Sequence, residues 1–106
     1  MPTTKGVVVD KREKRYVGVT CHTTTEGVVT PRTIDFDDGR HFEVQLVGER
    51  RRAHSFRVGG TGIRYTVCVN GSWTYLYFDD YRKRWFVEAK VPDDGDPRPQ
   101  TPITFP

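Results

Sequence analysis

Cysteine is scarce in this sequence, and long apolar runs are missing. The two cysteines, Cys21 and Cys68, stand far apart and form no CxxC pair. This excludes a dense disulfide framework and gives no support to a structural zinc site. The opening residues MPTTKGVVVDKREKR contain no apolar stretch long enough for a signal peptide or a membrane-spanning helix. We therefore expect an intracellular, cytoplasmic protein with both thiols reduced.

Helical periodicity is missing as well. No window keeps apolar residues at i, i+3, i+4 and i+7 over three turns. The best helix candidate, Val47–Ser55, would make two turns at most. Aromatic residues, in contrast, make up 12% of the chain, and alternation of the strand type is clear in segments such as Arg15–Thr20. The sequence predicts an all-β protein.

Length and charge indicate one domain followed by a C-terminal tail of different composition. The 106 residues suit a single domain with a modest core. Five of the seven prolines lie in PDDGDPRPQTPITFP, so we expect a domain over residues 1–91 and a flexible Pro/Asp-rich tail over residues 92–106. The net charge is +3; the tail's three aspartates and one arginine sum to −2, which leaves +5 on residues 1–91. Segregated positive charge favours an anionic partner.

Three hairpins are predicted from strands separated by turn residues. The first joins Arg32–Phe36 to Arg40–Val47 through a turn at Asp37–Gly39. Its inward side chains should be Ile34, Phe36, Phe42, Val44 and Leu46. The second hairpin turns at Asn70-Gly71, and the third lies within Phe78–Ala89.

Strand pairing decides which side chains share a face of the sheet. A two-residue loop at Asn70-Gly71 sets Val69 opposite Ser72, and a four-residue loop at Asp79–Arg82 would set Leu76 opposite Trp85. The first face would then hold the core residues Ile63, Tyr65, Val67, Val69, Leu76, Phe78, Trp85, Val87 and Ala89. The second face would hold Arg64, Thr66, Cys68, Trp73, Tyr75, Tyr77, Arg84, Phe86 and Glu88. A five-residue loop would instead mix charges into the aliphatic face, so we prefer the four-residue loop.

Trp73, Tyr75 and Tyr77 alternate along one strand and therefore form a row on the second face, among arginines. Two interpretations stay open. The row is either a second buried layer, covered by the segment around Tyr16–Val19, or an exposed platform on which bases or a partner's side chains stack.

The most basic window, Glu49–Arg57, is either a solvated connector or a loop that follows a phosphate backbone. In the second interpretation, phosphates would be contacted by Arg50, Arg51, Arg52, Arg57, Arg64, Arg82, Lys83 and Arg84, with additions from Asp10–Arg15. The adjacent VGGTGIR lacks the GxGxxG spacing, the Lys-Ser/Thr pair and the following helix of a phosphate loop. We expect a turn or bulge there, with positive φ at Gly59, Gly60 or Gly62.

No constellation for catalysis is recognisable. His22, His41 and His54 are scattered without metal-ligand spacing, and the neighbours Cys21 and His22 would point apart on a strand. The paired aspartates fall in turns, where they make local hydrogen bonds. We expect no catalytic residue, no metal and no cofactor.

Residues 59–90, with GGTGIRYTVCVNGSWTYLYF followed by RWFVEAK, resemble a group of small bacterial proteins of unassigned function from Firmicutes genomes and their mobile elements. The shared pattern is GGxGIRY, a Tyr-Leu-aromatic strand and a closing WFVE. The resemblance implies a compact β-fold and brings no catalytic residues. Because such genes often lie on mobile DNA, it also implies an anti-defence role, such as an anti-CRISPR inhibitor, as an option.

These patterns together predict a small, strongly twisted antiparallel barrel of five or six strands, SH3-like or OB-like, with one short helical turn near Arg50–His54. The function that we favour is a non-enzymatic module that binds nucleic acid or a nucleoprotein, with Tyr75, Tyr77 and Trp73 stacking on it. The competing hypothesis is a protein–protein module that inhibits a host enzyme through the same face. No membrane partner is expected, and the oligomeric state stays open.

Overall fold

The computed structural model describes residues 11–90 and residue 105, and all regular structure in that part is β. One antiparallel sheet contains seven strands, which confirms the predicted class and exceeds the five or six strands expected. The strands are β1 (Arg12–Thr23), β2 (Val29–Asp35), β3 (His41–Glu43), β4 (Leu46–His54), β5 (Thr61–Val69), β6 (Ser72–Asp79) and β7 (Arg84–Lys90).

The helical turn expected near Arg50–His54 is wrong, because these residues belong to β4. Strand β4 pairs with β5 from Leu46 opposite Cys68 to His54 opposite Thr61. The intrinsic preference of Arg50, Arg51 and Arg52 is compatible with a helix as well as with a strand. The ladder to β5 supplies the backbone hydrogen bonds, so tertiary pairing outweighs the weak local preference.

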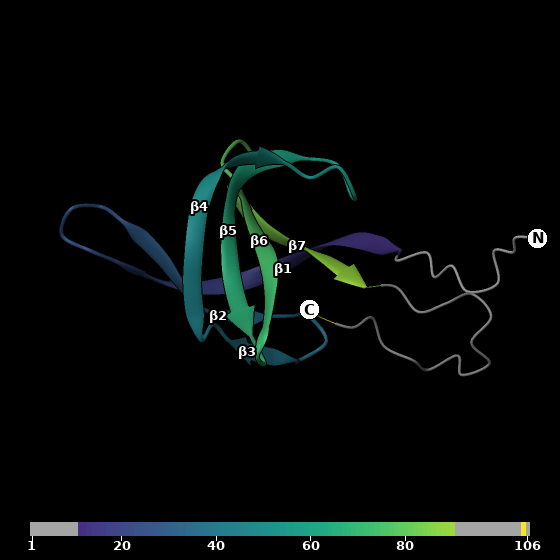
Figure 1. The fold of residues 1–106 in the computed structure, drawn as a ribbon, viewed down its shortest axis with the longest axis horizontal. Coiled ribbons are helices and arrows are strands. Elements are labelled where there is room, and N and C mark those ends of the chain that lie inside the picture. The colour runs from purple at the N-terminus through teal and green to yellow at the C-terminus, as the bar shows by residue number, and fades with distance from the viewer. Residues whose placement is uncertain (1–10, 91–104, 106) are drawn as a thin grey trace, which may run out of the picture.

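The strand order explains why the sheet is curled into a half-barrel (Figure 1). The order is β3-β2-β1-β7-β6-β5-β4, so the two edge strands are β3 and β4. In a flat sheet these edges would lie about 29 Å apart, at about 4.8 Å per strand. Only Val44 and Gln45 separate them in the chain, and these residues span about 10 Å. The sheet must therefore bend until its edges approach.

The residues at this corner pair with both sides of the sheet. The amide of Val44 donates to the carbonyl of Arg32 on β2, at 2.9 Å, and the amide of Gln45 donates to the carbonyl of Cys68 on β5, at 2.8 Å. The corner also changes the alternation of side chains. Leu46, predicted to point inward, pairs with Cys68 and is 59% exposed.

The core lies on the concave face of the curled sheet, and all nine residues predicted for the first face belong to it or pack against it. The buried members are Ile34, Phe36, Tyr65, Val67, Val69, Leu76, Val87, Ala89 and Phe105. Phe105 lies in the segment that we predicted as the C-terminal tail. Its ring centroid lies 5.6 Å from that of Phe36 and 5.5 Å from that of Phe42; residues 92–104 and 106 lie outside the described residues.

The hairpin at Asn70-Gly71 has the predicted register, from Val69 opposite Ser72 to Ile63 opposite Phe78. Both turn residues have positive φ, as this turn requires. The β6–β7 register is two residues away from the prediction, because Leu76 pairs with Val87 rather than with Trp85. A shift of two residues leaves every side chain on its face. The division into core face and second face is therefore confirmed.

Candidate functional site

The convex face, opposite the core, carries a cleft of about 440 Å³. One wall consists of side chains from β5 and β6. The other wall comes from the segment Ser55–Gly60 between β4 and β5, which we call the flap. The cleft is lined by Arg12, His54, Phe56, Arg57, Arg64, Thr66, Trp73, Thr74, Tyr75, Tyr77 and Glu88.

Glycines allow the flap to fold onto the convex face. The flap is closed by hydrogen bonds from the Ser55 amide to the Gly60 carbonyl (2.8 Å) and from the Gly59 amide to the Ser55 carbonyl (2.9 Å). Gly59 and Gly60 have φ of 78° and 103°, which confirms the expected turn with positive φ. A Cβ atom added at Gly60 would lie 3.3 Å from Cζ of Phe86. This tight contact and the positive φ both favour glycine at this position.

A buried carboxylate joins the flap to the floor of the cleft. The hydroxyl of Ser55 donates to Oε2 of Glu88 at 2.6 Å, and the hydroxyl of Tyr77 donates to the same oxygen at 3.2 Å. Ser55 is fully buried and Glu88 is 8% exposed. Burial, together with the neighbouring charge of Glu88, raises the pKa of Tyr77. The two hydroxyl donors offset the desolvation of the carboxylate.

Each of the two interpretations holds for part of the aromatic row: one end is buried and the other is exposed. Tyr77 is 2% exposed and stacks on Phe86, with centroids 4.8 Å apart and an interplanar angle of 1°. Its ring is closed to a ligand's base, which corrects its assignment as a stacking residue. Trp73 and Tyr75 are 55% and 38% exposed. Tyr77, the buried end of the row, is enclosed by Phe86 and the flap. The segment around Tyr16, which we expected to cover it, is instead a strand of the same sheet.

Arg64 is the predicted cation most closely associated with the open rings. Its guanidinium lies 4.2 Å from the centroid of Tyr75, a cation–π contact. Its Nη2 lies 3.9 Å from Glu49, and its Nε is buried without a hydrogen-bond partner. Arg51 pairs with Arg64 across β4 and β5. Arg57 reaches the same cleft from the flap.

Three other predicted cations lie away from the cleft. Arg50 is placed over the ring of Tyr65, 6.0 Å from its centroid. Arg52 is paired with Asp80 at 2.6 Å, and this partner lowers the pKa of Asp80. Arg82 is paired with Asp79, at 3.1 Å. These arginines contact Tyr65, Asp80 and Asp79 and do not line the cleft.

Sequence reasoning missed Phe56 and His54 as cleft residues. Phe56 is 92% exposed, and its ring meets that of His54 edge-on, with centroids 5.0 Å apart. The signal for Phe56 is an aromatic residue three positions before the Gly59-Gly60 pair. It stands among arginines, without the alternation that marks the other aromatic residues.

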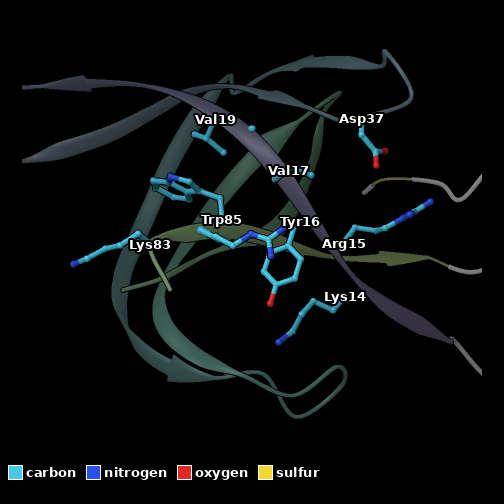
Figure 2. A pocket seen from close by; sticks show the side chains of 10 residues that line it. Lys14, Arg15, Tyr16, Val17, Val19, Asp37, Lys83 and Trp85 are labelled. Atoms are coloured by element: carbon cyan, nitrogen blue, oxygen red, sulfur yellow. The ribbon is translucent and has the colours of Figure 1, made fainter. Parts of the chain in front are cut away.

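A second concavity, of about 530 Å³, follows β1 and β7 (Figure 2). We call it the groove; it is lined by Lys14, Arg15, Tyr16, Val17, Gly18, Val19, Asp37, Lys83, Arg84 and Trp85. It contains the last two predicted cations, Lys83 and Arg84. The N-terminal basic segment contributes Lys14 and Arg15 to it, beside Tyr16.

Other kinds of site find little support in residues 11–90 and 105. No three His, Cys, Asp or Glu side chains in these ranges are placed to hold a metal ion. Both cysteines are unpaired, and burial raises the pKa of Cys21, which favours its thiol form. No helix in the described part is long and apolar enough to cross a membrane.

Comparisons with protein-family models, with curated proteins and with solved structures find no match. The resemblance to small mobile-element proteins therefore stays a prediction.

Proposed function

We propose that this protein is a non-enzymatic module that binds single-stranded nucleic acid, with bases in the cleft and phosphates at its rim. The observation that carries the proposal is the combination of open rings and arginines in one concavity. Trp73 and Tyr75 are 55% and 38% exposed, and the guanidinium of Arg64 lies over the ring of Tyr75. Stacking of a base on an aromatic side chain contributes about 1–3 kcal/mol and tolerates any base sequence.

The cleft suits an unpaired strand better than a duplex. Base faces are hidden in a duplex, whereas a single strand can place a base between aromatic side chains. The floor of the cleft carries the Glu88 carboxylate, which repels phosphate and favours the base there. The side chain of Arg64 lines the cleft and is 19% exposed, so the exposed part of its guanidinium can donate to an acceptor on the ligand.

The fluorescence of Trp73 tests the proposal. Octamers of deoxythymidine and of uridine are titrated into the protein at low salt, and we expect quenching that the Trp73→Phe variant loses. Tyr75→Ala should weaken binding about 5- to 150-fold, the equivalent of one stacked base. Tyr81→Ala is the matched control, since Tyr81 is 87% exposed but does not line the cleft. If neither octamer quenches the fluorescence at low salt, the proposal is wrong.

Salt separates this function from the competing protein–protein module. Phosphate contacts release counterions, so affinity for an oligonucleotide should fall steeply between about 50 and 200 mM salt. An interface with a protein partner would centre on the exposed rings, such as Phe56, which is 92% exposed. Its affinity should change little over the same range.

A further inference from the structure

Two cations lie over neighbouring rings at the groove. The guanidinium of Arg84 lies 3.5 Å from the ring centroid of Tyr16, and Nζ of Lys14 lies 4.7 Å from that of Phe86 and 5.8 Å from that of Tyr16. Lys83 lines the groove next to Arg84. Like charges that are held close together repel one another, and a bound anion would offset this repulsion.

The acidic residue of the groove lies apart from this cluster. Figure 2 shows Asp37 and Arg15 on one side of β1, and Tyr16 and Lys83 on the other. Arg15 also has an acidic neighbour, because its Nε lies 3.4 Å from Glu13. The alternation of β1 places Lys14 with Tyr16 and turns Arg15 away. The side of the groove around Tyr16 is therefore positively charged.

Lys83 has a backbone conformation that lysine rarely adopts. Its φ is 60°, in the left-handed region, where a Cβ atom is unfavourable. Within residues 11–90, Asn70 is the other non-glycine residue with positive φ, and it stands in a turn that prefers asparagine. Lysine has no such local preference. Strained residues cluster at binding sites, so this conformation motivates the hypothesis that the Lys83 side chain has a role.

We infer that the groove binds backbone phosphates of the same strand whose bases occupy the cleft, through Lys14, Lys83 and Arg84. This inference rests on the proposed function. The two sites are neighbours on the convex face, since Tyr77 of the cleft pairs with Phe86, and Phe86 pairs with Tyr16 of the groove. Two strand spacings separate them by about 10 Å. A strand of a few nucleotides spans both.

Lys83→Gly tests the groove because it should improve folding while it weakens binding. Glycine relieves the strained φ, so the melting temperature should rise. Removing one phosphate contact should reduce the slope of log K against log salt by about 0.7 for a single strand. The titration uses a deoxythymidine dodecamer and follows Trp73, whose quenching at saturation should be retained. Arg32→Gln removes a charge from an exposed position outside both cavities and should leave the slope unchanged.

A second probe separates the groove from the cleft. Tripolyphosphate carries no bases, and it should shift the backbone amide resonances of Lys83 and Arg84 in wild type but not in Lys83→Gly. An unchanged salt slope in Lys83→Gly, with no amide shifts from tripolyphosphate, would overturn the inference and leave the proposed function standing. Amide shifts without any binding of the dodecamer would support phosphate recognition by the groove and overturn the proposed function.

Discussion

Asp79 illustrates how one side chain positions the groove. It ends β6, and its Oδ1 accepts hydrogen bonds from the amides of Tyr81 and Arg82, both at 3.0 Å. The guanidinium of Arg82 donates to its Oδ2 at 3.1 Å. These bonds determine the course of the loop that leads to Lys83. They favour the charged carboxylate, and the amide of Arg82 makes the largest contribution to a lowered pKa of Asp79.

The lowered pKa predicts how stability depends on pH. In the unfolded chain the carboxyl titrates near its ordinary pKa of 3.8. Because the folded pKa is lower, the stabilisation is fully present above the unfolded pKa and is lost as pH falls through the folded pKa. Asp79→Asn keeps an oxygen acceptor but cannot titrate. Urea unfolding between pH 7 and pH 2 should therefore show a smaller loss of stability in the variant than in wild type. If the free energy of unfolding fell by the same amount in both proteins over this pH range, this role of Asp79 would be contradicted.

At the scale of elements, the local hairpins could be predicted and the flap could not. The Asn70-Gly71 turn and the alternation beside it are local signals, and they determined the register of β5 and β6. The flap depends instead on contacts between distant residues, such as Ser55 with Glu88. Nothing in the local pattern shows that Ser55–Gly60 folds over Phe86. The position of Arg64, Trp73 and Tyr75 on one face was thus foreseen, whereas Phe56 was missed.

The glycines at the base of the flap have different roles, which substitution with alanine should separate. A Cβ atom at Gly62 would overlap the carbonyl oxygen of Phe78 on β6, so the backbones must move apart. At Gly59 a Cβ atom meets nothing within 4 Å, and only its φ of 78° opposes alanine. We expect Gly62→Ala to lower the free energy of unfolding by about 3 kcal/mol or more, and Gly59→Ala by about 1 kcal/mol. Chemical denaturation measures both free energies. Equal losses in the two variants would show that the close approach of Gly62 to Phe78 does not make alanine more costly there.

At the scale of the molecule, a residue from the predicted tail packs into the core of the curled sheet. Figure 1 shows the C-terminal end beside β2 and β3, and Phe105 there contacts the rings of Phe36 and Phe42. Strand content and core face could be predicted because they follow from alternation along each strand. The contribution of Phe105 could not, since one aromatic residue after a proline-rich segment carries no periodic signal. In the curled sheet, the rings of Phe36 and Phe42 contact each other and both contact Phe105.

Phe105→Ala tests whether the C-terminal end belongs to the cooperative core. Phe105 is 6% exposed, so its removal should leave a cavity and lower the free energy of unfolding by about 3 kcal/mol. Phe56→Ala makes the same chemical change at a position that is 92% exposed, and it should leave stability within about 0.5 kcal/mol of wild type. Urea denaturation of both variants measures the difference. Similar midpoints for both would mean that the core is complete without Phe105, and that β2 and β3 close against the other strands by themselves.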